Sequence, residues 1–420
     1  MGTLDASIAN VALPTISRAY HHPVDDAEWV ILIFMLVTAS TLVMFGRLGD
    51  IFGQKRIYLG GFAVFGASSL ACAFAPSLEF LIVARAIQAI GAAMLLSSNQ
   101  ALIVDTFPVS MRGRAIGMNG AAVAVGLSLG PIIGGTIVTY FDWQWIFLIN
   151  VPISILAMLG AWRVLRPVQP KGGGLDPWGA AGSIVTLLAF ALALSRSHVW
   201  GWGSPLTLGL LIFSFVSFYV FVQFERRVAS PTLDMHLFSI RIFAFSTLAA
   251  FIYFIAFAGM TFIVPLHAQT ALHQSALSAG LLLTPITALN IVLAPLAGAL
   301  SDRVPVRYVS TFGAVVVATG MFLLSRLPAS PSMGQMLTAL IVAGCGTAVF
   351  TQPNNSAIMG SAPPEHRGSA AGTLATARTA GQLVGVSVAS AIYFAHGAQT
   401  YYSIIAAVML GVAALSWMRE

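Results

Sequence analysis

Long apolar runs, separated by short polar or Gly/Pro-rich breaks, extend along the whole chain. A helix needs roughly 20 apolar residues to cross the hydrocarbon core of a bilayer. The strands of a membrane β-barrel alternate over about ten residues, whereas these runs are longer and uniformly apolar. The pattern therefore predicts fourteen membrane-spanning helices, at approximately 4–20, 28–46, 57–75, 79–103, 115–138, 144–165, 178–195, 205–224, 242–266, 277–300, 306–325, 334–357, 369–394 and 399–418.

The first predicted span differs from the others because Met1 lies almost at its start. It does not have the pattern of a signal peptide, since no Lys or Arg precedes the apolar run and Asp5 interrupts it. We expect either a true start upstream of Met1 or a shortened first helix.

Composition supports a membrane protein and argues against a soluble enzyme. Of the 420 residues, 58% are apolar and 8% are charged, and the mean hydropathy is +0.87. Soluble domains contain about 25% charged residues. The net charge of +6 does not indicate nucleic-acid binding, because no basic run is present. Cys72 and Cys345 lie in apolar runs, so we interpret them as packing residues and expect no disulfide and no metal site.

The distribution of positive charge predicts the orientation in the membrane. Cytoplasmic loops of membrane proteins carry an excess of Lys and Arg. Fifteen of the 20 Lys and Arg residues fall in the loops after even-numbered spans and at the C-terminus, and three fall on the opposite side. We therefore expect a multi-pass protein of the inner (plasma) membrane with both termini in the cytoplasm.

Two parts of the chain resemble each other at a separation near 250 residues. The pattern R-G-x-A-x-G occurs at 112–117 and again at 367–372, and Gly91 and Asn99 match Gly346 and Asn354. Repeats of this kind are typical of transporters. They predict a six-helix bundle at 1–166, two inserted linker helices at 167–240, and a second six-helix bundle at 241–420.

Four segments place charges, glycines and proline inside or beside these runs. They read LDASIANVALP (4–14), GRLGDIFGQKR (46–56), RAIQAIG (85–91) and GLSLGPIIGG (126–135). With them, the chain resembles the major facilitator superfamily over essentially its whole length, and specifically its fourteen-helix drug:proton antiporter family (EmrB/QacA-like). The resemblance implies an all-α major facilitator fold of two six-helix bundles plus two inserted helices.

Asp5 is the candidate proton carrier. An acid inside a membrane helix is costly and is by default a functional residue. The alternative is that Asp5 lies at the cytoplasmic rim. Arg85 stays charged when buried and needs a partner. If the first and fourth helices are adjacent, as the resemblance implies, that partner is Asp5, and protonation of Asp5 breaks the pair. A purely structural role for Arg85 remains open, and Ala89 replaces a glycine of the family pattern.

The segment at 46–56 resembles the superfamily's loop between helices 2 and 3, which acts as a conformational switch. Its glycines permit a tight turn and close helix approach. The resemblance adds an acid at the end of the fourth helix and an arginine after it. Lys55 and Arg56 also fit a purely topogenic role. The predicted switch residues are Gly46, Arg47, Gly49, Asp50, Gly53, Lys55, Arg56, Asp105 and Arg112.

The segment at 126–135 is similar to the motif that marks exporters in the superfamily. Residues 126, 130 and 134 lie on one helix face and permit close packing, and a proline can bend the helix. Generic small-residue packing would explain the glycines alone. The predicted antiporter residues are Gly126, Gly130, Pro131, Gly134 and Gly135.

The second half offers further candidates for a cavity or switch. Arg378 lies inside a span where the family also has an arginine; hydrogen bonding to nearby backbone is the alternative role. Asp302, Arg303 and Arg307 echo the switch loop of the first half. The segment at 143–152 resembles the family's entry to its sixth helix, with Gln144 where an arginine is usual.

Taken together, these features predict a proton-coupled antiporter that exports small lipophilic compounds by alternating access. We expect no cofactor, because the proton gradient supplies the energy and no nucleotide-binding motif is present. The expected partners are protons, lipophilic substrates and the bilayer, without nucleic acid. The residues leave open a periplasmic adaptor and an outer-membrane channel.

Three alternatives remain open from the sequence. A proton-coupled importer of a small metabolite would share the fold, although the motif at 126–135 argues against it. A membrane-embedded enzyme lacks support because no metalloprotease or hydrolase motif occurs. A non-transporting scaffold or sensor is opposed only by the presence of the transport motifs.

Overall fold

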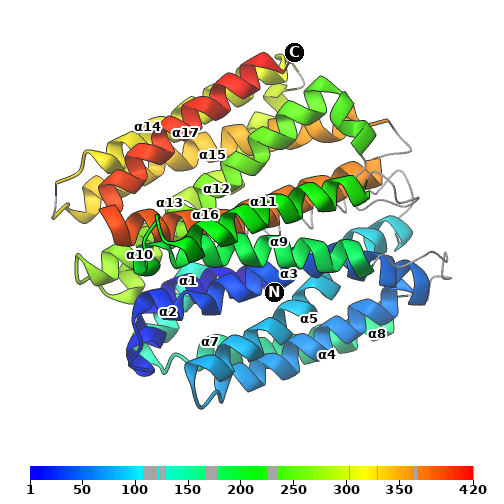
Figure 1. Ribbon diagram of the computed structural model, residues 1–420, viewed down its shortest axis with the longest axis horizontal. Coiled ribbons are helices and arrows are strands. Elements are labelled where there is room, and N and C mark those ends of the chain that lie inside the picture. The colour runs from blue at the N-terminus through cyan, green and yellow to red at the C-terminus, as the bar shows by residue number, and fades with distance from the viewer. Residues whose placement is uncertain are drawn as a thin grey trace. The chain divides into compact units, whose positions relative to one another are not determined.

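The computed structural model describes the chain except residues 107–121, 123–125, 127–128, 166–176, 226–234, 302, 329, 364–366 and 420. The described residues form helices and no strand (Figure 1). Each of the fourteen predicted spans overlaps a described helix. Nine helices in this part of the chain are long and apolar enough to cross a membrane, and Leu129–Tyr140 and Val185–Ser195 are shorter apolar helices. The predicted all-α membrane fold is confirmed.

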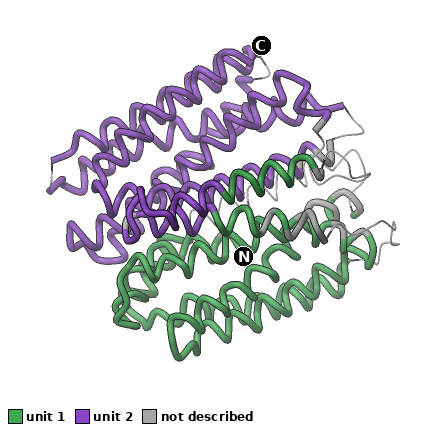
Figure 2. The backbone as a smooth tube through the Cα atoms, in the orientation of Figure 1, with its two compact units in different colours: residues 1–189, 213–224 green, residues 190–212, 225–420 purple. Residues whose placement is uncertain are grey.

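The described residues form two compact units (Figure 2). Unit 1 comprises 1–189 and 213–224, and unit 2 comprises 190–212 and 225–420. The two predicted linker helices, α9 (Pro177–Ser195) and α11 (Pro205–Glu225), are each divided between the units. The predicted boundaries at 166/167 and 240/241 stay a prediction.

Unit 1 contains the first repeat. In it, α4 packs against α5, α5 against α3, α8 against α4, and α1 against α3 and α7. Apolar composition forms these helices, and the turns between them begin where Gly or Pro interrupts the runs. The helices are α1 (Gly2–Ala19), α2 (Val24–Ala27), α3 (Trp29–Phe52), α4 (Gln54–Ala73), α5 (Leu78–Thr106), α7 (Trp145–Leu148) and α8 (Asn150–Val164).

Unit 2 repeats this pairing: α14 packs against α15, α15 against α13, and α17 against α14. In addition, α12 packs against α16, and the short α10 also contacts α16. The elements are α10 (Ser197–Trp200), the 3₁₀ turn η1 (Met235–Ser239), α12 (Arg241–Thr270), α13 (Ala276–Ser301), α14 (Val306–Ser325), α15 (Met333–Ser361), α16 (Arg367–His396) and α17 (Ala398–Met418).

Two glycines show that the repeat extends to atomic contacts. A Cβ atom at Gly91 of α5 would lie 2.6 Å from the backbone nitrogen of Phe65 in α4. A Cβ atom at Gly346 of α15 would lie 2.4 Å from the backbone nitrogen of Val317 in α14. The glycines are 255 residues apart and their contacts are 252 apart. The same close helix crossing therefore occurs in both halves.

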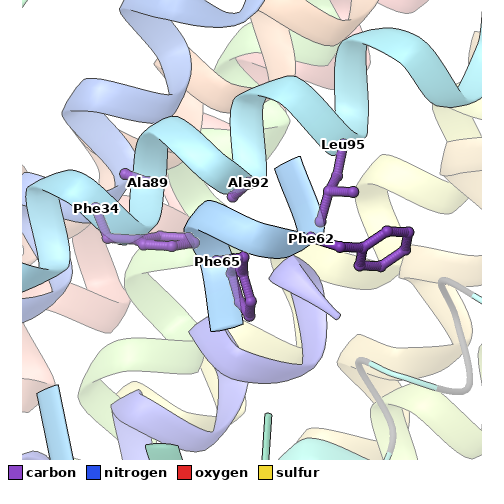
Figure 3. Packing of buried hydrophobic residues seen from close by; sticks show 6 residues of the cluster. All are labelled: Phe34, Phe62, Phe65, Ala89, Ala92 and Leu95. Carbon is purple, nitrogen blue, oxygen red and sulfur yellow. The ribbon is translucent and has the colours of Figure 1, made fainter. Parts of the chain in front are cut away.

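A buried apolar cluster joins α3, α4 and α5 (Figure 3). Ala89 belongs to it and is fully buried, so its methyl group fills space where the family pattern has glycine. Residues 85 and 89 are one helical turn apart, and the cluster therefore supports the helix surface on which Arg85 lies. The cluster consists of Phe34, Phe62, Phe65, Ala89, Ala92 and Leu95.

Candidate functional site: a buried ion pair between helices α1 and α5

Asp5 of α1 and Arg85 of α5 form a buried ion pair. Asp5 is 2% exposed and Arg85 is fully buried. Nη1 of Arg85 donates a short hydrogen bond to Oδ2 of Asp5. The pairing expected from the sequence is therefore present, and Asp5 lies in a buried network instead of at an exposed rim. The role of this pair in proton coupling stays a prediction.

Two amides complete the hydrogen bonds of the Asp5 carboxylate. Asn150, the first residue of α8, donates from Nδ2 to Oδ1 of Asp5 at 2.8 Å. Gln88 donates from Nε2 to the same oxygen at 3.2 Å and also to Oγ of Ser69 at 2.7 Å. Each of the three side chains that contact the carboxylate therefore donates a hydrogen bond to it. The sequence motifs contain Gln88 and Asn150, but no role was predicted for either residue. The feature that could have indicated one is a polar side chain inside an apolar run.

Arg85 has contacts that do not depend on Asp5. Its Nε donates to the backbone oxygen of Val30 in α3 at 3.0 Å, and its Nη1 donates to Oε1 of Gln88 at 2.6 Å. The guanidinium carbon lies 4.2 Å from the ring centre of Phe34 and 5.6 Å from that of Phe147. Nη2 is buried without a partner among the described residues. The arginine is thus held by several helices, as a permanent buried charge requires.

The predicted antiporter glycines bring a helix backbone against α1 close to Asp5. In the helix Leu129–Tyr140, a Cβ atom at Gly130 would lie 1.7 Å from Oγ of Ser7, and one at Gly134 would lie 3.1 Å from Cα of Ile8. Pro131 and Gly135 are buried in this helix, and Gly126 precedes it. Glycine at 130 and 134 therefore determines how closely this helix approaches the turn of α1 that contains the acid.

The switch loop is described in part. Gly53 has a φ of 95°, which favours glycine, and the turn closes α3 before α4 begins. Nζ of Lys55 donates to the backbone oxygens of Trp162 and Leu165, at 2.8 and 2.5 Å. Lys55 thus satisfies carbonyls at the C-terminal end of α8, in addition to any topogenic role. Gly46 and Gly49 lie in α3, and Arg56 is exposed. Outside the described residues or side chains lie the predicted switch charges Arg47, Asp50, Asp105 and Arg112.

In unit 2, Arg378 lies in the middle of α16 and is half-buried. It makes no hydrogen bond or ion pair within the part of the chain that the structure describes. Nη2 of Arg307 donates to the hydroxyl of Tyr308 at 2.9 Å, and its guanidinium lies 5.7 Å from the Trp417 ring centre. Arg303 is exposed, and Asp302 lies outside the described residues.

Arg419 forms a second buried polar cluster that the sequence did not predict. The charge pattern predicts this residue on the cytoplasmic side, which stays a prediction, and in the structure its side chain is 1% exposed. Its Nη1 donates to Oδ1 of Asn354 at 3.0 Å and to Oγ of Ser246, and its Nη2 donates to Oγ of Ser310 at 3.0 Å. Position alone gave no signal, because burial here depends on how α12, α14, α15 and α17 meet.

The described residues contain no group of His, Cys, Asp and Glu side chains that could hold a metal ion. Both cysteines are free; Sγ of Cys72 lies 3.9 Å from Oε1 of Gln88, beside the ion pair.

The sequence model of the Major Facilitator Superfamily matches the chain twice, at residues 1–247 and 246–420. The two matches cover the whole chain and agree with the internal repeat. The chain belongs to the Major Facilitator Superfamily. Together with its apolar helices, this membership makes it an integral membrane transporter and places it among transporters, not enzymes.

Three relatives align over most of their length. The chain is 37% identical to the uncharacterized transporter YebQ of Escherichia coli, covering 99% of this chain and 91% of that protein. It is 31% identical to the riboflavin transporter RibZ of Clostridioides difficile, covering 94% and 85%. It is 30% identical to the multidrug efflux pump LfrA of Mycolicibacterium smegmatis, covering 93% and 78%.

A solved structure of a POT family transporter in complex with a thioalcohol-conjugated peptide has a similar fold. The TM-score is 0.77 over 98% of this chain and 92% of that chain. The sequences are 11% identical, so this likeness supports the fold alone.

Proposed function

We propose that this transporter is a proton-coupled antiporter of the fourteen-helix drug:proton antiporter family, which exports small lipophilic compounds across the inner membrane with both termini in the cytoplasm. The observation behind the proposal is the Asp5 carboxylate, which is buried among transporter helices and ion-paired with Arg85. A carboxyl group in that position changes charge at a large electrostatic cost or gain, as a coupling site must.

The proton reaches Asp5 from the outer side. In the predicted topology, α3 and α8 begin on that side, and Val30 and Asn150 lie at those helix starts. Protonation removes the attraction between Asp5 and Arg85, so α1 is released from α5. The two repeats then alternate between outward- and inward-facing states, as internal repeats of transporters permit.

Export as the direction of transport rests on the glycine contacts of the helix Leu129–Tyr140 with α1, and on the name of the efflux pump among the relatives. One proton is enough for a neutral substrate. A potential of about 100 mV contributes about 2.3 kcal/mol, and one pH unit adds about 1.4. Together, roughly 3.7 kcal/mol supports a gradient of roughly 500-fold. No cofactor is required.

Arg378 contributes to the substrate cavity of the second half. A charged side chain in the middle of a membrane helix needs a partner, and the described residues supply none. We propose that Arg378 interacts with the transported compound or with water that accompanies it. Adaptor and outer-membrane partners stay open.

Import of a metabolite is the second candidate function, and the riboflavin transporter among the relatives favours it. The two functions differ in direction. A protein that accumulates riboflavin in vesicles of native orientation under an inward proton gradient is an importer. A proton-coupled exporter accumulates lipophiles in inverted vesicles whose lumen is more acidic than the medium, because protons leave the lumen as the substrate enters.

The test measures uptake of a fluorescent lipophilic cation and of a neutral lipophilic dye into inverted vesicles with an imposed pH gradient. Wild type, Asp5→Asn and Arg378→Gln are compared at matched protein levels. We expect wild type to respond to the gradient and Asp5→Asn to lose the response. Arg378→Gln should retain proton dependence and change the relative uptake of the two dyes.

Two outcomes oppose the proposal. Export that continues unchanged after a protonophore collapses the gradient rules out proton coupling. Export by Asp5→Asn that equals wild type at every pH removes Asp5 from the mechanism, whatever the fold.

A further inference from the structure

Only one of the two polar atoms of the Asn150 side-chain amide makes a hydrogen bond among the described residues. Nδ2 donates to Oδ1 of Asp5 at 2.8 Å, whereas Oδ1 of Asn150 is buried with no hydrogen-bond partner among the described residues. The residue is fully buried. A buried amide oxygen without a partner is unfavourable, so its presence beside an acid suggests a second state in which it is used.

Protonation of Asp5 creates an O–H donor on the carboxyl group, but the side chains that contact this group present only N–H donors to it. A proton on Oδ2 would face Nη1 of Arg85, which can only donate. A proton on Oδ1 would face Nε2 of Gln88 and Nδ2 of Asn150, which also donate. The protonated acid therefore gains a hydrogen-bond acceptor only if one of the two amides, Gln88 or Asn150, rotates to present its oxygen.

Gln88 is poorly suited to turn. Its Oε1 accepts from Nη1 of Arg85 at 2.6 Å, and its Nε2 donates to Oγ of Ser69 at 2.7 Å. Turning the amide would place two donors against each other at Arg85. The Asn150 amide makes one hydrogen bond, and a rotation of 180° exchanges its nitrogen for its unused oxygen at the same position.

We propose that Asn150 is a positioning residue that follows the charge of Asp5. Its amide donates Nδ2–H to the ionised carboxylate and, after rotation about the Cβ–Cγ bond, accepts the proton of the neutral acid at Oδ1. The inference rests on the proposed proton coupling at Asp5. The only bond formed is O–H on Asp5, with a proton from the outer aqueous phase, and the same bond breaks when the proton leaves to the cytoplasm.

The other charged and titratable groups around Asp5 do not change in this scheme. They lie on α5, on α4 and at the N-terminal end of α1. Variants at Asn150 leave them intact, so a change in pH dependence is attributable to Asn150. These groups are Arg85, Cys72 and the amino group of Met1.

The test compares wild type with Asn150→Leu, which has a similar volume but neither donates nor accepts. Transport in reconstituted vesicles is measured as a function of pH, and infrared difference spectra between low and high pH report the protonated carboxyl group. Asp5→Asn identifies the Asp5 band by its loss. Ser154→Ala is the matched control, because Ser154 lies one turn further along α8, is 2% exposed, and donates its hydroxyl to Sδ of Met1 at 4.0 Å.

We expect Asn150→Leu to favour the protonated acid, because the charge-assisted bond lost by the carboxylate is stronger than the neutral bond lost by the acid. The pH of half-maximal transport should rise by about 0.5–1 unit, a three- to tenfold change in proton affinity. The Asp5 carboxyl band should move to higher wavenumber, since its proton has lost an acceptor. Ser154→Ala should change neither.

A second measurement needs no apolar substitution. With ¹³C-labelled asparagine amides, the carbonyl band of Asn150 should move to lower wavenumber when Asp5 is protonated. That band should be missing from Asn150→Thr, whose rotatable hydroxyl both donates and accepts and keeps the pH of half-maximal transport close to wild type.

Each failure has its own signature. If transport is proton-driven and the Asp5 band is present, but Asn150→Leu or the labelled amide shows no change, the role of Asn150 is wrong and the proposed function survives. If wild type shows neither proton-driven transport nor an Asp5 band, the proposed function fails, and the Asn150 inference fails with it.

Discussion

The polar residues that surround Asp5 on α4 and α5 have apolar equivalents on α14 and α15. Shifted by the repeat offsets of 252 and 255, the set Ser69, Cys72, Arg85 and Gln88 becomes Met321, Leu324, Leu340 and Ala343. All eight residues are at most 2% exposed. The halves therefore share helix crossings and burial but differ in chemistry, which teaches that the fold requires filled space at these positions and does not require charge.

The second half places its own buried polar cluster, Arg419 with Asn354, at the far end of the corresponding helices. Asn354 lies 14 residues after Leu340 on α15, whereas Arg85 and Gln88 lie near the start of α5. The Arg419 cluster contains an arginine with hydroxyl and amide partners. We therefore expect titration to act through the first half, and the following predictions test that division.

The largest effect is expected for Arg85→Leu, which gives the first half the residue of the second. It leaves Asp5 buried without its counter-charge, so the free energy of unfolding should fall by about 3–5 kcal/mol. Proton-driven transport should be abolished. The double variant Asp5→Asn/Arg85→Leu should regain much of the stability, measured by thermal unfolding, without regaining transport. An Arg85→Leu protein as stable as wild type would contradict the buried pair.

A smaller and symmetrical effect is expected for Gly91→Ala and Gly346→Ala. Each Cβ would meet backbone of the neighbouring helix, so each variant should lose about 1–3 kcal/mol of stability. Gly160→Ala and Gly411→Ala, which have no atoms within 4 Å, are the matched controls in the two halves and should be neutral or slightly stabilising. Unequal losses at Gly91 and Gly346 would break the equivalence of the halves.

Asn354→Leu tests the polar cluster of the second half. It removes the acceptor of Arg419 and the donor to the backbone oxygen of Ser246, so unfolding should become easier by about 1–3 kcal/mol. The pH dependence of transport should remain that of wild type. A shifted pH profile in this variant would show that titration is not confined to the first half.

Lys55→Met is expected to have the smallest effect. It removes a cation from the C-terminal carbonyls of α8, which stabilises a helix end by about 0.3–1 kcal/mol. The exposed Arg56→Met is the control and should not change thermal stability. Equal melting temperatures for both variants would remove the contact from consideration.

Much of the fold followed from the sequence because apolar runs report helices directly. The Asp5–Arg85 pair was expected because Arg85 needs a partner and the family resemblance implies that the first and fourth helices are adjacent. The partners Asn150 and Ser69 did not, because only the packing of α8 and α4 brings them to the carboxylate. The burial of Arg419 was not predicted for the same reason: it depends on how four separate helices meet around the side chain.

The cap that Lys55 places on α8 has a mechanical consequence. At its first turn, Asn150 of α8 donates to Asp5, and at its C-terminal end the carbonyls accept from Lys55 in the first turn of α4. Its 15 residues span about 22 Å. We therefore expect a displacement at one end of this short helix to move the other end, which would couple the Asp5 carboxyl group to the start of α4.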